Sequence, residues 1–342
     1  MGLGVHVSTP AFVAILSLWT AVALAASAVL IVRLERLGAR FGFTEASLGL
    51  LAALAADAPE ITSAVTALRH GQHDIGVGVV LGSNVFNLAA LLGLSAIIAG
   101  RIAFHRNVVI IEGGVGIWVA ILAVAVLLHL LPAAGALALA AMVFVPYVWL
   151  SAMSPTRRSD IRWMRRVSQS IMRGIADAES EVRPAEHELT ADPQHSHRSG
   201  RDALLAAASI VVVVYASIQM EGGMATLGTR WHLSDAIVGA VILAAITSLP
   251  NAVAAIYLAR RGRGAATLSE AMNSNTINAI AGFLIPATII GVGVTSAAST
   301  TVGWWYLGLT VVCLAIAYAL RGITRYAGVI IIAAYAVFVA RL

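Results

Sequence analysis

The chain has 342 residues, of which 59% are hydrophobic and 11% are charged, and its mean hydropathy is +0.88. Because a soluble domain carries about 25% charged residues, this composition excludes a soluble protein and predicts an all-α integral membrane fold. The net charge of +5 comes from arginine, since all 22 basic residues are arginines. These arginines lie between apolar segments, as membrane topology requires, which excludes nucleic acid as a partner.

Ten segments approach the roughly 20 apolar residues that a membrane-spanning helix needs. In chain order they are 11–32, 44–68, 74–98, 107–129, 133–152, 203–220, 234–258, 266–291, 303–320 and 326–340. These segments predict about ten transmembrane helices in contact with the lipid bilayer. The one long polar stretch, 153–202, joins the fifth segment to the sixth.

The arginines are distributed unevenly between the two sides of the membrane. Nineteen of the 22 lie in loops that follow odd-numbered segments, and only Arg69, Arg230 and Arg341 lie on the other side. Cytoplasmic loops of membrane proteins are enriched in basic residues. We therefore expect a multi-pass protein of the cell membrane with a cytoplasmic loop at 153–202 and both termini outside.

The second half of the chain repeats the first half. Three aligned pairs carry the repeat: "LGARFGFTEASLG" with "LGTRWHLSDAIVG", "DAPEITSAV" with "SLPNAVAAI", and "LGSNVFNLAALLG" with "MNSNTINAIAGFL". The spacing agrees as well, because 27 residues separate Glu60 from Asn87 and 27 separate Asn251 from Asn278. Two sequences that agree in both residue type and spacing indicate a duplicated unit.

The two copies enter the membrane from opposite sides, because the first follows a cytoplasmic loop and the second follows an external loop. The chain is therefore predicted to form two inverted five-helix halves, 1–152 and 203–342, which carry the repeats at about 37–98 and 227–290. Inverted repeats are typical of secondary transporters, whose binding sites lie near the middle of the membrane where helices are broken.

Two carboxylates and a proline interrupt an apolar run near the start of the first copy. Asp57 and Glu60 are three residues apart, so they share a face of a helix, and charged side chains inside a membrane are usually functional. Pro59, and Pro250 in the second copy, lack a backbone donor and break the helix. The freed carbonyl oxygens require a protein-lined cavity rather than lipid.

Hydroxyl and amide side chains complete an all-oxygen set of candidate ligands. Its members are Asp57, Glu60, Ser83, Asn87, Thr247, Ser248, Asn251, Ser274 and Asn278. Oxygen ligands suit hard cations such as Na⁺ and Ca²⁺, whereas zinc or copper would prefer His and Cys. We expect Asn251 to face Glu60, because the repeat relates the two positions. No cofactor and no enzyme activity are expected, since the sequence shows no nucleophile–base pair.

Further polar residues in the apolar segments have two interpretations each. Asn84 and Asn275 are possible pathway residues, although asparagines in membrane helices also hydrogen-bond across helix interfaces. Glu270 lies four residues before Ser274 on the same helical face and either lines the inner mouth of the pathway or starts a helix at the interface. Glu112 is expected to pair with His105 or Arg106, or to reach the interface.

At these residues the sequence resembles the calcium/cation antiporter superfamily, which includes the sodium/calcium exchangers. Members carry "G-T-S-x-P-E" and "G-S-N-x-F-N/D" elements in two alpha repeats, and here "AADAPE", "GSNVFN", "ITSLPN" and "NSNTIN" fit that scheme. The resemblance implies two inverted five-helix halves. It also implies that the family's cation ligands fall on Glu60, Ser83, Asn87, Thr247, Ser248, Asn251, Ser274 and Asn278.

The chain departs from the family pattern in its carboxylates. The family usually has a second glutamate at the position of Asn251 and often an aspartate at the position of Asn278. The first copy has Ala56 and Asp57 where the family has threonine and serine. Two carboxylates are thus lost and one is gained, and both that remain lie in the first copy.

Three interpretations of function follow from these residues. The leading one is a secondary active antiporter that exchanges Ca²⁺, or a related cation, for Na⁺ by alternating access. Asp57 and Glu60 are close enough to titrate as a coupled pair, so a proton-coupled cation exchanger is the alternative. A non-transporting cation sensor or channel-like pore belongs to another class and leaves the two broken-helix copies without a purpose. The sequence leaves the transported cation, the coupling ion and the oligomeric state open.

Overall fold

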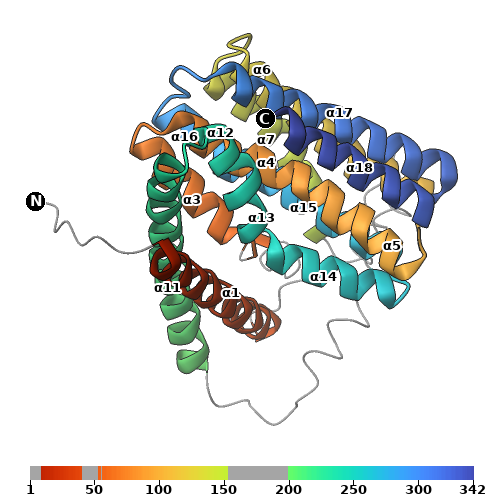
Figure 1. The fold of residues 1–342 in the computed structure, drawn as a ribbon. Coiled ribbons are helices and arrows are strands. Elements are labelled where there is room, and N and C mark those ends of the chain that lie inside the picture. Colours follow the sequence, from red (N-terminus) through yellow and green to blue (C-terminus); the bar gives the residue numbers. More distant parts are fainter. Residues whose placement is uncertain (1–8, 41–52, 55, 153–198) are drawn as a thin grey trace, which may run out of the picture.

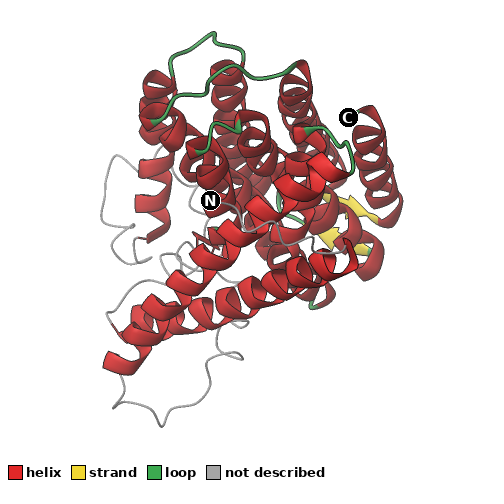
Figure 2. Ribbon diagram, turned by 60° about the vertical axis from the view of Figure 1, so that its left-hand side comes forward, coloured by secondary structure: helices red, strands yellow, loops and turns green. Residues whose placement is uncertain are grey.

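The structure is a computed structural model that describes residues 9–40, 53–54, 56–152 and 199–342 (Figure 1). The described part is a bundle of long helices with one short two-stranded sheet at one end (Figure 2). Most of the expected loop at 153–202, and the first part of the second expected segment, lie outside the described residues.

The first half contains α1 (Thr9–Arg40), α3 (Ala58–Arg69), α4 (His73–Asn87), η1 (Leu88–Leu94), α5 (Ser95–Ala99), β1 (Arg101–Ala103), α6 (Arg106–Leu127) and α7 (Ala133–Ala152). The second half contains α11 (Ser199–Arg230), α12 (Asp235–Ile237), η2 (Val238–Leu243), α13 (Ala244–Thr247), α14 (Leu249–Arg260), α15 (Gly264–Ile277), η3 (Asn278–Leu284), α16 (Ile285–Ile289), α17 (Ala297–Leu320), β2 (Gly322–Thr324) and α18 (Arg325–Arg341). The elements η1, η2 and η3 are π-helical turns inside longer helices.

Six of the described helices are long and apolar enough to cross a membrane, and a bent pair, Asp235–Thr247 with Leu249–Arg260, forms a seventh. The continuous run from α15 to α16 and the short α18 correspond to the eighth and tenth expected segments. The predicted all-α membrane fold is confirmed, and its helices agree roughly with the ten expected spans.

The backbone repeats as the sequence does. Helices α3 and α14 each have 12 residues, and the π-helical turns η1 and η3 each have 7. The turns that lead into α4 and α15 both contain a glycine with a φ of +75°, at Gly71 and Gly262. Such a φ is left-handed and favours glycine. The same local rules therefore build both copies, so that corresponding polar residues reach corresponding places.

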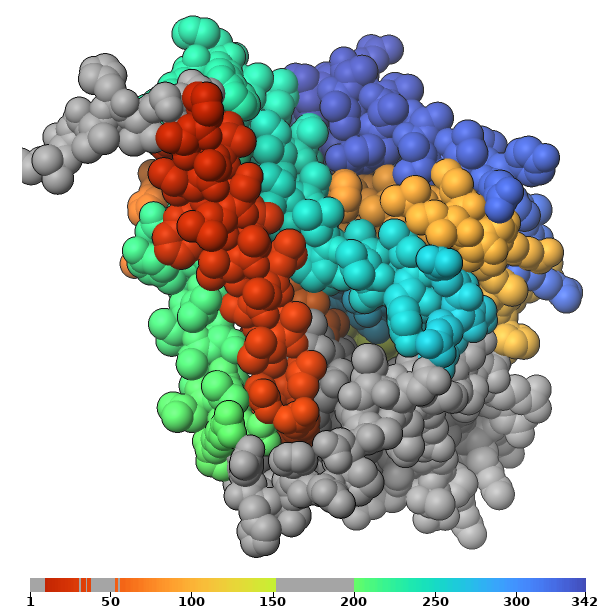
Figure 3. Space-filling view, turned by 60° about the horizontal axis from the view of Figure 1, so that its bottom comes forward, coloured from red at the N-terminus to blue at the C-terminus, as the bar shows by residue number. Residues whose placement is uncertain are grey.

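Helices α1 and α11 lie side by side along one flank of the bundle, as the red and green segments of Figure 3 show. Arg33 and Asp202 form an ion pair of 2.8 Å between them, and the rings of Trp19 and Tyr215 meet edge to face at 5.3 Å. These contacts place the end of α1 next to the start of α11.

Helix α4 runs through the buried centre of the bundle and touches the second copy backbone to backbone. A Cβ atom on Gly82 would overlap the backbone of Ala240 in η2, and one on Gly78 would lie 2.9 Å from the Ala240 nitrogen. Small residues at such crossings let membrane helices approach closely. The crossing brings the polar end of α4 against the broken helix of the second half.

Three arginine-bearing loops meet at one end of the bundle. Strands β1 and β2 pair antiparallel there, with Arg101 opposite Thr324. Gly264, which opens α15, packs so tightly on the Ala103 carbonyl that a side chain would not fit. Arg101 also donates to the Leu320 carbonyl at the end of α17, at 3.1 Å. The loops that follow the third, seventh and ninth expected segments thus share one side.

Candidate cation-binding site

Both copies break their helix at the positions where the prolines predict a break. Asp57 precedes α3 with a φ of −82°, and Ser248 precedes α14 with a φ of −83°. The second broken helix bends by 49°. Because Pro250 has no N–H group, the carbonyl of Ile246 loses its usual helical donor. The breaks turn the side chains of Asp57 and Ser248 into the protein interior, where both are fully buried.

Asp57 is held by two donors from the other half of the chain. Its Oδ1 accepts a hydrogen bond from Asn251 Nδ2 and another from Ser274 Oγ, both at 2.7 Å. The partner of Asn251 is therefore Asp57 rather than Glu60, which corrects the expectation from the sequence. The reason is geometric. The two broken helices run antiparallel about the pseudo-two-fold axis, so Asp57 meets Asn251, which lies one turn beyond the position equivalent to Asp57.

Glu60 makes the contact that the pseudo-two-fold axis relates to the Asp57–Asn251 contact. Its Oε1 accepts from Ser248 Oγ at 3.0 Å. The repeat relates Asp57 to Ser248 and Glu60 to Asn251, so the Asp57–Asn251 and Glu60–Ser248 contacts are images of each other. The two broken helices thus meet across a pseudo-two-fold axis, and each holds the other through one pair of side chains.

Ser274 is the centre of the hydrogen-bond network. It donates to Asp57, and its Oγ accepts from Asn251 Nδ2 at 3.0 Å and from Asn87 Nδ2 at 3.1 Å. The hydroxyl thereby links the broken helices to α4. Asn87 also donates to Asn275 Oδ1 at 3.0 Å. Four helices from both halves of the chain are joined at this hydroxyl.

Asn84 and Asn275 form a reciprocal pair on the same axis. Asn84 Nδ2 donates to the Asn275 carbonyl at 3.0 Å, and Asn275 Nδ2 donates to the Asn84 carbonyl at 3.1 Å. These two bonds tie α4 to α15 at the point where the copies cross. The contacts explain why both asparagines are buried, and their possible role in the pathway stays a prediction.

The network leaves acceptor oxygens without donors. Within the described residues, the buried oxygens that lack a hydrogen-bond partner include Asp57 Oδ2, Glu60 Oε2, Asn87 Oδ1, Asn251 Oδ1 and Asn278 Oδ1. Asn278 Nδ2 is also unpaired. Buried polar atoms are nearly always hydrogen-bonded, so such a group of unpaired oxygens requires an explanation. A cation is the natural partner for a set that consists mainly of acceptors.

Ser83 and Thr247 lie beside the network without joining it. Ser83 Oγ donates to the Val80 carbonyl, and Thr247 Oγ1 donates to the Leu243 carbonyl, both at 2.9 Å. Each hydroxyl oxygen keeps its lone pairs free to accept or to coordinate. Ser83 is one turn before Asn87 on α4, so the two share a face.

All nine predicted ligands are buried. Hydrogen bonds join four of them around the Ser274 hydroxyl, and Glu60 and Ser248 form the neighbouring pair one turn along the broken helices. These six residues and their unpaired oxygens are here called the oxygen cluster. The structure therefore brings together ligands that the sequence places far apart in the two copies.

The oxygen cluster contains two carboxyl groups and, among the described residues, no positively charged partner for them. Neither Asp57 nor Glu60 has an ion pair within the part of the chain that the structure describes. Glu270 is half-buried on α15, one turn before Ser274. Its proposed place at the inner mouth of a pathway stays a prediction. Uncompensated carboxylates inside a membrane are costly, and an entering cation would remove that cost.

Glu112 has other partners than those expected from the sequence. Its Oε2 lies 2.8 Å from Tyr147 Oη, within hydrogen-bonding distance, and its Oε1 accepts from Ser269 Oγ at 3.1 Å. Arg106 instead donates to the Tyr318 carbonyl at 3.3 Å. The expectation of a His105 or Arg106 partner is therefore wrong, because α6 turns Glu112 inward toward α7 and α15.

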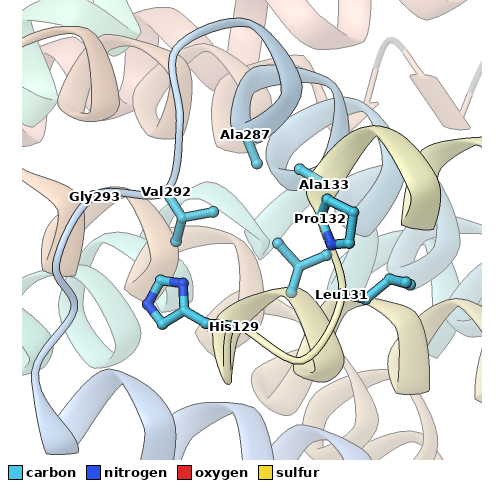
Figure 4. A pocket seen from close by; sticks show the side chains of 8 residues that line it. His129, Leu131, Pro132, Ala133, Ala287, Val292 and Gly293 are labelled. Carbon is cyan, nitrogen blue, oxygen red and sulfur yellow. The ribbon is translucent and has the colours of Figure 1, made fainter.

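A cavity of about 490 Å³ lies elsewhere, between the turn after α6 and the loop after α16 (Figure 4). Its lining contains a single titratable group, the imidazole of His129, among mostly apolar side chains. The lining residues are Val126, His129, Leu131, Pro132, Ala133, Ala287, Val292 and Gly293. The cavity shares no residue with the oxygen cluster and offers no carboxylate to a cation.

Comparison with known proteins gives one family and a set of similar folds. The model of the sodium/calcium exchanger protein family matches residues 11–154 and 202–342. Comparison with curated protein sequences finds no significant match. Solved structures with a similar fold are native YfkE (18% identity, TM-score 0.59, 98% of this chain and 92% of that one), the H⁺/Ca²⁺ exchanger CAX (14%, 0.72, 95% and 81%) and the sodium-calcium exchanger NCX_Mj (18%, 0.59, 97% and 98%).

Proposed function

Because the chain belongs to the sodium/calcium exchanger family, as its repeats predict, we propose that it is a secondary active antiporter. It exchanges Ca²⁺, or a related cation, for Na⁺ by alternating access. The observation that carries this proposal is the cluster of buried oxygens around Asp57 and Glu60. It joins both halves of the chain and has unpaired acceptors at both carboxylates.

The nine clustered or adjacent oxygen-bearing residues are the proposed cation ligands. They supply carboxylate, amide and hydroxyl oxygens, which are the ligands that Ca²⁺ and Na⁺ prefer. Ligands come from both broken helices and from α4 and α15: Asp57, Glu60, Ser83, Asn87, Thr247, Ser248, Asn251, Ser274 and Asn278. A relative movement of the two halves would open and close such a site, which is the principle of alternating access.

Proton coupling is the second candidate, and the Asp57–Glu60 pair favours it. Both carboxylates are fully buried, one turn apart, with no basic ion-pair partner in the described chain. Two interacting acids release their protons in steps that belong to the pair. A proton taken up by the pair would displace a cation, which couples the two fluxes.

We also propose the orientation with the arginine-rich loops in the cytoplasm and both termini outside. The meeting of the β1, β2 and α15 loops on one side supports this arrangement. A cysteine introduced into the loop 153–202, in a background without Cys313, should react with a membrane-impermeant thiol reagent only in inside-out vesicles. Labelling in intact cells would contradict the proposed orientation.

Transport in inside-out vesicles tests the function directly. Ca²⁺ uptake is measured under a Na⁺ gradient alone and under a pH gradient alone, for wild type, Glu60→Gln and the control Glu221→Gln. Glu221 is also a buried carboxylate in a span, but it lies on α11 and contacts His70 at 3.7 Å. Glu60→Gln should abolish uptake in a folded protein, whereas the control should retain it. Equal uptake by wild type and Glu60→Gln would contradict the proposed site.

A further inference from the structure

Another buried acid, Glu112, contacts α15 outside the oxygen cluster. Glu112 from α6 is 6% exposed and contacts Tyr147 from α7 and Ser269 from α15. Tyr147 Oη also lies 3.1 Å from Asn273 Oδ1, again on α15. These four side chains, here called the Glu112 cluster, bind three helices together and contain none of the proposed cation ligands.

The hydrogen atoms in this cluster can be counted. A tyrosine hydroxyl has one proton, yet Tyr147 Oη lies within hydrogen-bonding distance of both Glu112 Oε2 and Asn273 Oδ1. Both contacts are hydrogen bonds at once only if the carboxyl group is protonated. Glu112 then donates to Tyr147, and Tyr147 donates to Asn273. In the ionised state Tyr147 donates to Glu112, and the Asn273 amide must turn its NH₂ group toward Tyr147.

Among the described residues, the helices packed around Glu112 bring no positively charged side chain to it. The elements packed on α6 are α7, α15, α17 and η3, and their titratable side chains are Tyr147, Glu270, Tyr306, Cys313 and Tyr318. None of these side chains carries a positive charge, and Arg106 is occupied at Tyr318, over whose ring its guanidinium lies at 4.9 Å. A buried carboxyl without a positive partner is held most readily as the neutral acid.

The Glu112 cluster differs from the oxygen cluster in how its acid is paired. Both carboxyl oxygens of Glu112 lie at hydrogen-bonding distance from hydroxyl groups, whereas Asp57 and Glu60 each keep one oxygen without a partner. A single acid whose oxygens are already hydrogen-bonded suits a proton as its ligand. Asn273 directly precedes Ser274, the centre of the cation network, so a turn of the Asn273 amide acts on the helix that carries Ser274.

We propose that the Glu112 cluster is a second proton-binding site, separate from the Asp57–Glu60 pair, and that its protonation sets the hydrogen-bond state of α15. Loss of the proton reverses the Tyr147 hydrogen bond and turns Asn273. The site thereby changes the affinity of the neighbouring oxygen cluster for its cation. The binding of the proton stands on the geometry of Glu112 alone, while its effect on cation affinity rests on the proposed function.

Infrared difference spectroscopy of the purified protein during a pH titration tests proton binding directly. The wild type should show carbonyl stretching bands of buried protonated carboxylic acids. Glu112→Gln should lose the component that belongs to Glu112, and Glu221→Gln should keep it. Tyr147→Phe should keep this component but shift it, because the acid loses a hydrogen-bond partner. Bands that are all unchanged in both Glu112→Gln and Tyr147→Phe would overturn the proposal.

Transport measurements test the coupling to α15. The substitution Glu112→Gln mimics the neutral acid, because the new amide donates to Tyr147 while its carbonyl oxygen accepts from Ser269. The variant should transport Ca²⁺, while the pH dependence of its apparent affinity shrinks by about 5-fold or more, the usual size of coupling between two sites. A wild-type pH profile in the variant would overturn the coupling. Absence of transport in the wild type would refute the proposed antiport but leave the infrared result standing.

Discussion

A charge swap between the two repeats is the most direct test of the proposed site. The chain carries both carboxylates in the first copy, at Asp57 and Glu60, and the structure shows that Asp57 contacts Asn251 across the two-fold axis. The combination Asp57→Ser with Asn251→Glu moves one carboxylate from the first copy to the second. The number of charges is unchanged, and the acids then follow the usual family pattern.

Each single change should impair the site for a different reason. Asn251→Glu replaces a donor by a carboxylate beside Asp57. At the present N–O distance of 2.7 Å and an effective dielectric constant near 20, two like charges repel by about 6 kcal/mol. Asp57→Ser leaves the donors of Asn251 and Ser274 without their charged acceptor, and each such hydrogen bond contributes about 1.5–3 kcal/mol.

The double variant should recover transport for two reasons. The change at Asp57 removes the repulsion that the new glutamate would meet, and the new glutamate replaces the carboxylate that Asp57→Ser removes. We expect each single variant to lose at least about tenfold in Ca²⁺ uptake, which corresponds to about 1.4 kcal/mol. The double variant should exceed both. The assay is Ca²⁺ uptake into inside-out vesicles at equal protein levels, with detergent-purified samples checked for folding by gel filtration.

A second double variant serves as the control. Glu60→Gln with Asn251→Glu has the same net charge, but it leaves Asp57 facing the new carboxylate. It should not recover transport. If the Asp57→Ser and Asn251→Glu effects simply multiply, or if the control recovers equally well, then Asp57 and Asn251 do not form a coupled pair at the cation site.

Two shorter predictions concern pH and packing. If Asp57 and Glu60 bind an exchanged proton, apparent Ca²⁺ affinity should fall on acidification between about pH 8 and pH 5, because protons compete for the carboxylates. The substitution Asp57→Ser should flatten this pH dependence. An unaltered pH profile in the variant would refute proton coupling through the pair. Gly82→Ala should lower thermal stability by forcing α4 away from Ala240, whereas Gly114→Ala, which meets no atom within 4 Å, should not; equal stability of the two variants would contradict the close crossing.

Much of the site can be predicted from the sequence, because prolines and carboxylates are rarely found inside an apolar run without a functional role. Prolines and carboxylates in an apolar run point to a broken helix, and the structure places breaks at Asp57 and Ser248. The equal spacing of the two copies predicts that Asn87 and Ser274 lie near them, and these residues do meet. Local chemistry and repeat spacing suffice for these features.

Contacts between distant helices cannot be predicted in the same way. The pairing of Asp57 with Asn251 depends on how two antiparallel helices cross, which the sequence does not encode locally. The partners of Glu112 escape prediction because Tyr147 lies in another apolar segment, whereas His105 and Arg106 are close in sequence. The same holds for the π-helical turns η1 and η3, since one extra residue per turn hardly alters the apolar pattern.

Asn278 provides the last prediction, because it separates stability from function. Both polar atoms of its amide are buried and unpaired among the described residues. Each unpaired buried group costs about 1–3 kcal/mol, so Asn278→Leu should stabilise the protein without cation. The same change at Asn275 should destabilise it, because Asn275 Nδ2 donates to the Asn84 carbonyl and its Oδ1 accepts from Asn87.

Thermal unfolding in detergent, with and without Ca²⁺, measures both effects. A ligand at about 100 times its dissociation constant stabilises a protein by about 2.7 kcal/mol, so Ca²⁺ should raise the unfolding temperature of the wild type. In Asn278→Leu this increase should shrink, since one ligand oxygen is lost, while the unfolding temperature without Ca²⁺ rises. A variant that is destabilised like Asn275→Leu, or that gains as much from Ca²⁺ as the wild type, would show that the Asn278 amide does not serve the cation.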